Sequence, residues 1–438
     1  MVDRNIHSEL WFHGLLPRED IRVMLRKNGD FLVRSTEPRP GEPRQYVLST
    51  MKSEEQEDQG IKHFVLKEGK GQIFIETKGF DTISALIAHH LSTKEPIKQT
   101  CVLRNPIVKQ DWEIDHNQVV LTKKLGEGAF GEVWKGKITL KNGKQEDVAV
   151  KSAKLESLNK EQIKEIMREA RLMRFLDHPN IVRFYGVGAG QEPLYVIMEL
   201  ADSGALDSYL QKNPNMTMPK KMEMIYQAAC GVGYMHEKHL LHRDIAARNC
   251  LYGGGQVKIS DFGLSREGVL YTMDMSKKVP IRWLAPETLR GGVYTPKTDV
   301  YAFGIMSWEI CENGKEPYAE MRVADVAREV LTGGRLQFKP DVCADYVKFI
   351  NKSCWSENPN DRSFMPEIIK YFQKTYKFKP VVVHPKDEHM DSAKTKPKKK
   401  LLGGLFSSAH SSPAHSTAHP SGHLTPHSTA THPAHPTH

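Results

Sequence analysis

Five short motifs occur in order between residues 126 and 287, and this ordered set constrains the fold more than any other feature of the chain. Each motif alone is a weak signal, because turn glycines, surface lysines and structural aspartates are common in all proteins. Their order and spacing together are much more specific. The motifs are Gly126-Glu-Gly128-Ala-Phe-Gly131, Val148-Ala-Val-Lys151, His242-Arg-Asp244 with Asn249, Asp261-Phe-Gly263 and Ala285-Pro-Glu287.

The glycine-rich loop allows the backbone to approach phosphate groups closely, because glycine has no Cβ to obstruct them. Similar loops occur in dinucleotide-binding folds, where they join a strand to a helix. Here strand-like sequence lies on both sides of the loop from Val119 onward, and the strand that carries Lys151 comes next. This order argues against a dinucleotide site. It favours a β-rich lobe followed, beyond about residue 205, by a mostly helical lobe, with an active site between them.

The ordered set closely resembles the protein kinase family, in which catalysis is mainly positioning and electrostatic stabilisation of the transferring phosphoryl group. The resemblance implies that Asp244 accepts the proton of the substrate hydroxyl. It also implies that Lys151, paired with Glu169, holds the α- and β-phosphates of ATP. Asn249 and Asp261 are expected to bind Mg²⁺, with Mn²⁺ as an alternative, because hard cations prefer oxygen ligands.

The same resemblance places the ATP-binding residues around the glycine loop and on the segment between the lobes. Met198 is the expected gatekeeper beside the adenine, and residues 199–201 are expected to offer backbone hydrogen bonds. Glu287 is expected to pair with Arg362 as a structural bridge, and Asp299 to brace the catalytic loop. The full ATP-binding set is Leu125, Gly126, Glu127, Gly128, Ala129, Phe130, Gly131, Glu132, Val133, Ala149, Lys151, Met198, Glu199, Ala201 and Leu251.

The catalytic loop, Asp244-Ile-Ala-Ala-Arg248-Asn249, indicates which hydroxyl is phosphorylated. Serine and threonine kinases usually carry a lysine two residues after the catalytic aspartate. Here that position is Ala246, and the cation comes at Arg248 instead. This pattern resembles the tyrosine kinases, as does Val279-Pro-Ile-Arg-Trp283, so the expected substrate is protein tyrosine. A local packing variation in a serine kinase is the alternative.

Tyr271 lies between Asp261 and Glu287 and is the expected autophosphorylation site. A phosphate there would add nearly two negative charges, which Arg243 and Arg266 could pair with, ordering the loop. A loop tyrosine without regulatory use is the alternative.

The N-terminal part of the chain predicts a separate small domain. Short β-type runs alternate with a helix after Pro17 and another after Asp81, an N-cap candidate. Trp11-Phe-His-Gly14 and Gly29-Asp-Phe-Leu-Val-Arg34-Ser resemble the SH2 family. An arginine on a buried strand is costly, and a guanidinium poised to bind phosphate explains it.

The resemblance implies a phosphotyrosine site made of Arg18, Arg34, Ser35, Thr36 and His63. Val65 stands where several SH2 domains have a lysine that contacts the phosphate, so binding is expected to depend more heavily on Arg18 and Arg34. A structural arginine in an unrelated α+β domain is the alternative.

Considered as a whole, the chain most closely resembles the Fes/Fer subfamily of non-receptor tyrosine kinases, without that family's long N-terminal membrane-curving region. The marks are a short linker between the two domains, Leu91-Ser-Thr-Lys-Glu-Pro96, Met198-Glu-Leu200 and Ser-Arg-Glu-Gly-Val-Leu-Tyr271. We therefore expect an α+β chain: an SH2 domain over 10–105, a linker over 106–117, a bilobal kinase over 118–377 and a disordered tail over 378–438. The SH2 domain is expected to bind tyrosine-phosphorylated proteins and to help activate the kinase.

The tail owes its predicted disorder to its composition, since it holds too few apolar residues to offset chain entropy. Beyond residue 407 it is almost entirely Ser, Thr, Ala, Pro and His, and residues 394–400 are basic. Weak contact of the lysines with anionic membrane, and loose binding of Zn²⁺ or Ni²⁺ by the histidines, are alternatives to plain solvated disorder.

Composition bounds the remaining functions. A net charge of +9, concentrated partly in the tail, does not indicate a nucleic-acid-binding domain. Six scattered cysteines, no signal peptide and no apolar run of membrane-spanning length predict a cytoplasmic enzyme, with peripheral contact at the inner face of the plasma membrane as an alternative. We expect the enzyme to be a monomer. A catalytically weak phosphotyrosine adaptor or scaffold is the competing function. Intact Lys151, Asp244, Asn249 and Asp261 argue against it.

Overall fold

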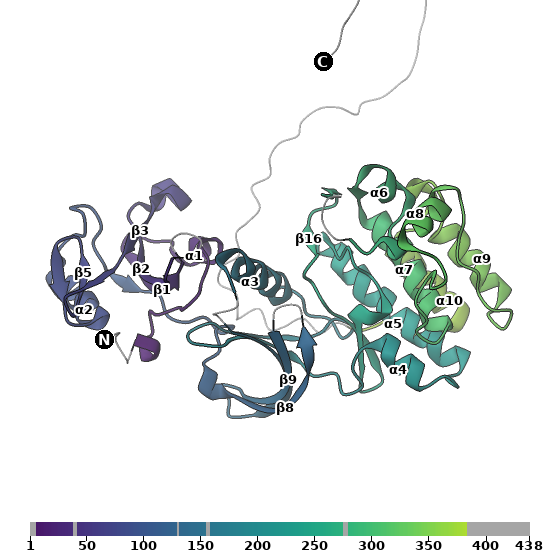
Figure 1. Ribbon diagram of the computed structural model, residues 1–438, viewed down its shortest axis with the longest axis horizontal. Coiled ribbons are helices and arrows are strands. Elements are labelled where there is room, and N and C mark those ends of the chain that lie inside the picture. Colours follow the sequence, from purple (N-terminus) through teal and green to yellow (C-terminus); the bar gives the residue numbers. More distant parts are fainter. Residues whose placement is uncertain (1–5, 38–41, 129–130, 155–157, 275–278, 383–438) are drawn as a thin grey trace, which may run out of the picture. The chain divides into compact units, whose positions relative to one another are not determined.

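The computed structural model describes residues 6–37, 42–128, 131–154, 158–274 and 279–382 (Figure 1). Within these ranges helices and strands are mixed, and the predicted α+β class is confirmed. None of the described helices is long and apolar enough to cross a membrane. All six cysteines are unpaired, and all but Cys343 are buried.

The N-terminal domain is built on a four-stranded sheet in the order β3-β2-β1-β7. Side chains of β1 alternate between the two faces of the sheet. Phe31 and Val33 belong to the core on the side of α2, whereas Leu32 packs with residues of α1 on the other side. The elements are α1 (Arg18–Met24), β1 (Asp30–Thr36), β2 (Gln45–Met51), β3 (Ile61–Val65), β7 (Asn105–Pro106), the small sheet β4 (Lys67–Gly69), β5 (Gln72–Ile75) and β6 (Lys78–Phe80), and α2 (Ile83–Thr93).

The start of α2 differs by one residue from the prediction. The N-cap is Thr82, whose hydroxyl accepts the backbone N–H of Ala85 at 3.0 Å. Asp81, the expected cap, instead accepts a hydrogen bond from the side chain of Gln72 on β5. A hydroxyl and a carboxylate in adjacent positions can both cap a helix, so the neighbouring strand decides between them.

A second sheet, in the order β11-β12-β10-β9-β8, forms the β-rich lobe predicted after Val119. Its elements are β8 (Val119–Gly128), β9 (Gly131–Thr139), β10 (Gln145–Ala153), β11 (Phe184–Gly188) and β12 (Leu194–Glu199). One helix, α3 (Lys160–Arg174), packs Ile163, Ile166 and Met167 into the same core as residues of β11 and β12. Asn159 is the N-cap of α3 and forms a capping box with Gln162.

The remaining lobe is helical. Every residue of α7 from Thr298 to Cys311 is buried, as expected of a helix at the centre of a lobe. The helices are α4 (Leu206–Lys212), α5 (Met218–Glu237), α6 (Pro286–Gly291), α7 (Pro296–Cys311), α8 (Val323–Leu331), α9 (Ala344–Ser353) and α10 (Met365–Tyr376). Short strand pairs join them: β13 (Leu240–Leu241) with β16 (Arg266–Glu267), β14 (Cys250–Gly253) with β15 (Gln256–Ile259), and β17 (Tyr271–Thr272) with β18 (Val293–Tyr294).

The chain packs beyond the last helix. Phe378 stacks on Tyr226 of α5 with ring centroids 5.0 Å apart, and the Tyr226 hydroxyl donates to the Lys379 carbonyl at 2.8 Å. These two residues fall within the tail that was predicted to be disordered. The prediction began the tail too early because the sequence did not indicate that Phe378 packs against the core. The rest of that tail from residue 383 onward lies outside the described residues.

The predicted linker is held against the β-rich lobe by backbone hydrogen bonds. Val187 N–H on β11 donates to the Trp112 carbonyl, and Ile114 N–H donates to the Val187 carbonyl, each at 2.8 Å. A Cβ at Gly186 would lie 2.3 Å from the Trp112 carbonyl oxygen, so only glycine permits this approach. On the other side, the His13 ring bonds to the Glu113 carboxylate at 2.8 Å. Residues 112–114 of the linker therefore contact both domains.

Candidate functional site

Lys151 and Glu169 form an ion pair between the sheet and α3. Alternation along β10 puts Val148 and Val150 in the core on one face of the sheet, and Lys151 faces the other side, toward α3. The Lys151 Nζ lies 3.0 Å from the Glu169 Oε1. Burial disfavours the ammonium charge, but the carboxylates of Glu169 and Asp261 outweigh it, so the pKa of Lys151 lies above its ordinary value. The lysine is thus a fixed cation.

The glycine loop is the hairpin between β8 and β9. A Cβ at Gly126 would meet nothing within 4 Å, and one at Gly128 would make ordinary contacts, which leaves room for a ligand beside the backbone. Gly131 is glycine for a different reason. Its φ is +150°, and a Cβ there would lie 2.2 Å from the Ser152 carbonyl oxygen of β10. Ala129 and Phe130 lie outside the described residues.

The candidate adenine-binding residues come from several strands. Ala149 on β10 pairs with Met198 on β12, which is buried, and Val148 pairs with Glu199. Leu251 lies on β14 and forms an isolated bridge with Ala205. Leu125 is half exposed on β8, and the Glu199 carboxylate is engaged by the Lys258 ammonium at 3.0 Å. Ala149 and Leu251 also pack against the hydrophobic core that contains Met198, and the Glu199 side chain is already paired.

The catalytic loop is held from beneath by a buried carboxylate. Asp299 on α7 accepts the backbone N–H groups of His242 and Arg243, both at 2.9 Å. It also accepts the His236 ring at 3.0 Å and the Tyr294 hydroxyl at 2.8 Å. Burial raises the pKa of such a group, but these donors prevail and hold the pKa of Asp299 below its ordinary value. The bracing role predicted for Asp299 is confirmed.

Three candidate catalytic residues are connected within this loop. The Asn249 amide donates to the Asp244 carbonyl at 2.8 Å, and the Arg248 guanidinium bonds directly to the Asp244 carboxylate. Arg248 also lies over the Trp283 ring, 4.0 Å from its centroid. The Asn249 carbonyl accepts the Ser260 N–H at 2.9 Å, which places the residue before Asp261 against Asn249.

Asn249 and Asp261 offer oxygen ligands that suit a divalent cation. The amide of Asn249 donates through its nitrogen, which leaves its oxygen for a metal. Asp261 is exposed and has a φ of +59°, a strained backbone conformation found at functional sites. The described residues contain no cluster of three or more His, Cys, Asp or Glu side chains suited to a metal. Two protein oxygens fit Mg²⁺ held partly by substrate phosphates, the usual arrangement in kinases.

Tyr271 lies on β17 beside two cations. The Arg243 guanidinium is 3.9 Å from the centroid of its ring, and that of Arg266 is 5.7 Å away. Burial lowers the pKa of Arg243, and the neighbouring Arg266 acts in the same direction. The structure thus brings together the tyrosine and the two arginines that the sequence suggested as its partners.

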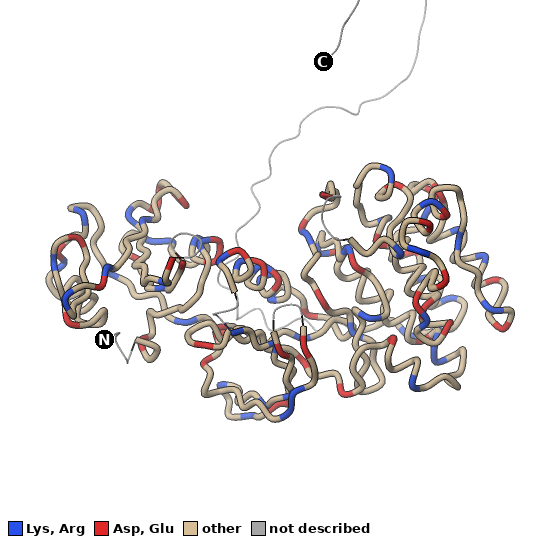
Figure 2. The backbone as a smooth tube through the Cα atoms, viewed as in Figure 1, with Lys and Arg blue, Asp and Glu red and all other residues tan. Residues whose placement is uncertain are grey.

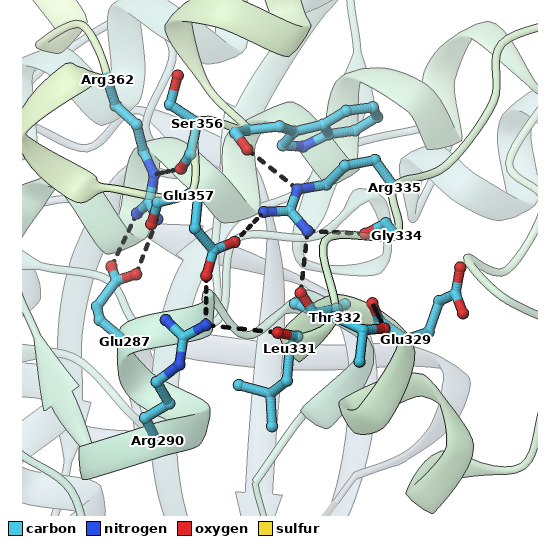
Figure 3. Close-up of polar contacts among 12 residues, drawn as sticks. Glu287, Arg290, Glu329, Leu331, Thr332, Gly334, Arg335, Ser356, Glu357 and Arg362 are labelled. Carbon is cyan, nitrogen blue, oxygen red and sulfur yellow. Dashed lines mark hydrogen bonds and ion pairs between the residues drawn. The ribbon is translucent and has the colours of Figure 1, made fainter.

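Glu287 and Arg362 form the predicted structural bridge. Two parallel hydrogen bonds of 2.8 Å join the guanidinium to the carboxylate, and the arginine side chain is fully buried (Figure 3). A second carboxylate, Glu357, bonds to both Arg290 and Arg335 in the same view.

Two residues of the site were missed from the sequence. Arg168 on α3 donates to the carbonyls of Gly263 and Ser265 at 2.7 and 2.8 Å, tying the helix to the segment after Asp261. Glu309 on α7 accepts the Ala247 N–H and the Trp283 ring N–H, both at 3.0 Å. Burial raises the pKa of Glu309 to about 8. Neither residue belongs to a short motif, so only their charge on a buried or packed helix could have signalled them.

The N-terminal domain holds a pocket of about 380 Å³ around Arg34. This arginine lies on β1, is 3% exposed, and its buried Nε has no hydrogen-bond partner among the described residues. Arg18 from the start of α1, Ser35, Thr36 and His63 line the same pocket. All five predicted residues are therefore brought together.

The electrostatics of the pocket favour an anion. Burial, with help from Arg18, lowers the pKa of Arg34 to about 10, which still leaves it charged at neutral pH. Burial and the two arginines lower the pKa of His63 to about 4, so the ring is neutral. His63 accepts or donates a hydrogen bond of 2.9 Å with the Ser49 hydroxyl. An anionic ligand would relieve the repulsion between the arginines.

The two domains meet at α1 and α3. The Asp20 carboxylate, 1% exposed, bonds to the Arg171 guanidinium at 3.0 and 2.9 Å and to Arg174 at 3.4 Å. Leu15 N–H donates to the Ala189 carbonyl at 3.1 Å. Along its length α3 carries charges of both signs (Figure 2). The buried Asp20 carboxylate is therefore one of the contacts that join the N-terminal domain to the helix that carries Glu169.

Comparison with known proteins agrees with this geometry. Residues 119–372 match the protein tyrosine and serine/threonine kinase family, and residues 11–90 match the SH2 domain family. Fer-related kinase 1 of Caenorhabditis elegans is 38% identical over 385 residues, which cover 86% of this chain and 96% of the relative. Tyrosine-protein kinase Fer of Homo sapiens is 39% identical over 84% of this chain, which spans 44% of that protein. The transforming protein Fps of Avian sarcoma virus (strain PRCII) is 36% identical over 82% of this chain and 66% of its own length.

These matches establish the activity at the level of the family. The kinase domain phosphorylates protein tyrosine with ATP and a divalent cation, and the SH2 domain binds tyrosine-phosphorylated proteins. The chain belongs to the Fer/Fes family of non-receptor protein tyrosine kinases, with an SH2 domain ahead of the kinase domain.

Proposed function

We propose that Asp244 is the catalytic base of this tyrosine kinase and that Lys151, held by Glu169, positions the phosphates of ATP. The observation that carries the proposal is the 3.0 Å pair between Lys151 and Glu169, because it needs β10 and α3 to be in their productive arrangement. Asn249 and Asp261 would hold Mg²⁺, which neutralises charge on the phosphates when bound. The remaining ATP-binding residues keep the roles expected above.

Arg248 positions the substrate in this proposal. Its guanidinium is held between the Asp244 carboxylate and the Trp283 ring, so its charge is fixed beside the base. A phenol is longer than a serine hydroxyl, and a cation four residues beyond the base leaves room for it. The tyrosine hydroxyl would meet Asp244 and give up its proton as the phosphoryl group arrives.

The SH2 domain would bind phosphotyrosine at Arg34 and Arg18 and help to keep the kinase active. Contact between Asp20 and Arg171 would stabilise α3, and α3 carries the Glu169 that holds Lys151. The linker, bonded to β11 through Trp112, supports this placement. Tyr271 would be the autophosphorylation site, where a phosphate would add charge between Arg243 and Arg266.

Further proposals concern the setting of the enzyme. We infer action as a monomer in the cytoplasm, with Mn²⁺ able to replace Mg²⁺ and no role in binding nucleic acid. Contact of the lysines at 394–400 with anionic membrane is a secondary proposal, and it concerns residues outside the described ranges.

Phosphopeptide stimulation of the full chain tests the coupling of the two domains. A tyrosine-phosphorylated peptide should raise the rate at which a separate peptide substrate is phosphorylated. Arg34→Lys should remove both binding and stimulation, because lysine keeps the charge but loses the planar fork. Arg22→Lys is the matched control, since this arginine of α1 is largely exposed and does not line the pocket. Stimulation that persists in Arg34→Lys would contradict the proposal.

A further inference from the structure

We propose that the kinase domain completes the phosphotyrosine pocket of this chain, with Lys160 and Lys164 of α3 supplying cations to the phosphate. The inference rests on the proposed phosphotyrosine site around Arg34 and adds two residues from another domain to it. The bound partner remains a tyrosine-phosphorylated peptide.

Residues of both domains line the pocket. Its lining includes Arg18, Arg34 and Arg44 from the SH2 domain together with Lys160 and Lys164 from the first two turns of α3. Residues four apart in a helix lie on the same face, so the two lysines stand one above the other along one side of the pocket.

Two hydrogen bonds fix the start of α3 at this position. The Lys160 backbone N–H donates to the Glu37 carboxylate at 3.0 Å. The Arg44 guanidinium donates to the Leu158 carbonyl at 3.1 Å. Glu37 follows β1 directly, two residues after Ser35, so the segment that carries the predicted phosphate donors is bonded to the helix. The lysines are thus placed by the same strand that carries Arg34.

The SH2 side of the pocket carries only a small excess of positive charge. Val65 lines the wall with an apolar side chain, and the carboxylates of Glu19 and Glu37 line it as well. On its own the SH2 domain contributes three arginines against these two carboxylates, and α3 adds two lysines. A phosphotyrosine carries nearly two negative charges near neutral pH, so this addition changes the balance of the site.

Both lysine side chains can reach a ligand without the loss of a strong interaction. Lys164 pairs with Glu161 at 3.0 Å, but the carboxylate is 72% exposed and the pair is on the surface. Such pairs contribute little to stability and exchange readily. Lys160 donates through its backbone to Glu37, which leaves its ammonium free to turn toward the pocket.

A pocket shared by two domains couples ligand binding to their contact. A phosphopeptide that touches both Arg34 and the α3 lysines binds the docked arrangement more tightly than the SH2 domain alone. By linkage it stabilises docking by the same factor. The coupling then passes through the ligand itself, in addition to the contact between Asp20 and Arg171.

The test uses the full chain and a fluorescent tyrosine-phosphorylated peptide. Lys160→Ala/Lys164→Ala should weaken binding about tenfold and reduce its dependence on salt, because two charges near a dianion are lost. Alanine favours helix, so α3 is retained. Lys137→Ala/Lys144→Ala is the matched control: both lysines lie in the same lobe, are exposed and pair with carboxylates. It should bind within twofold of the unmodified chain, as should Lys160→Arg/Lys164→Arg.

Separate outcomes distinguish this inference from the function on which it rests. Equal affinity of the alanine variant and its control, with binding lost in Arg34→Lys, would overturn the shared pocket and leave the phosphotyrosine site standing. Full binding by Arg34→Lys would overturn both. Inorganic phosphate should compete only weakly with the peptide, and to the same extent in every variant that keeps the lysines. If phosphate competes as well as the peptide, the pocket is a general anion site and the proposal fails.

Discussion

Asp20 offers the sharpest perturbation of the contact between the two domains. Its carboxylate is 1% exposed and accepts two hydrogen bonds from Arg171 and one from Arg174. Asp20→Asn keeps the shape of the side chain but removes its charge. Breaking a buried ion pair from one side typically destabilises by about 3–5 kcal/mol. The two arginine side chains are 25% and 14% exposed, so they regain part of their hydration.

We therefore expect Asp20→Asn to weaken docking by about 2 kcal/mol. Since about 1.4 kcal/mol corresponds to a tenfold change, the equilibrium between docked and separated domains should shift about thirtyfold. The initial rate of peptide phosphorylation by the full chain should fall toward that of the undocked kinase. Phosphopeptide affinity should fall less, because Arg34 itself is untouched.

Asp58→Asn is the matched control for this experiment. Asp58 is an SH2 carboxylate that lies 3.8 Å from Arg22, and both side chains are more than half exposed. Its loss should leave the rate within twofold. A double-mutant cycle with Arg171→Gln should show that the effects of Asp20→Asn and Arg171→Gln are not additive. Equal rates for Asp20→Asn and Asp58→Asn would refute the reasoning.

Two further predictions follow from perturbed groups. The unfolded chain protonates His63 near pH 6.5 and the folded SH2 domain only near pH 4, so domain stability should fall as pH drops through this window. In urea unfolding measurements, the free energy of unfolding of His63→Asn should depend less on pH between pH 6.5 and pH 4 than that of the unmodified chain. An equal pH dependence would contradict this prediction. Glu309, with a pKa of about 8, is mostly neutral at pH 7, so kinase assays should find Glu309→Gln within about threefold of normal. Glu309→Ala should lose tenfold or more with the two hydrogen bonds, and equal damage by both variants would contradict the neutral form.

The residues of the catalytic core could be predicted because they lie in short sequence motifs. Lys151, Asp244, Asn249 and Asp261 each sit in a motif whose spacing fixes the loop or strand around it. Glu169 was expected through the resemblance to the kinase family, and the structure pairs it with Lys151. In the SH2 pocket, Arg34 was recognisable as an unusual residue on a buried strand. The other pocket residues were expected through the resemblance to the SH2 family.

Long-range contacts were much less accessible. Glu309 reaches the catalytic loop from the middle of α7, 62 residues away from Ala247. Arg168 donates to backbone carbonyls 95 and 97 residues further along the chain. Because every residue has a backbone carbonyl, the sequence does not indicate which of them accepts such a bond. From the sequence we expected the SH2 domain to help activate the kinase, but the sequence did not identify Asp20 as a residue that joins the domains. Such contacts depend on how separate helices and strands pack together, and the local sequence pattern does not indicate that packing.

One local inference was right about the residue and incomplete about its cause. The glycines of the loop were attributed to the approach of phosphates. The open space at Gly126 agrees with that reason, whereas Gly131 is required by the closeness of β10. A motif can thus combine residues that serve a ligand with residues that serve the fold, and only the positions of neighbouring atoms separate the two.

The turnover of Asp244→Asn tests the central claim most directly. The full chain should transfer the γ-phosphate of Mg²⁺-ATP to a tyrosine peptide, and not to the same peptide with serine in place of tyrosine. Asp244→Asn should lower turnover at least a hundredfold while ATP affinity stays within about threefold, since the phosphate-binding residues remain. Near-normal turnover of Asp244→Asn, or equal phosphorylation of the serine peptide, would contradict the account.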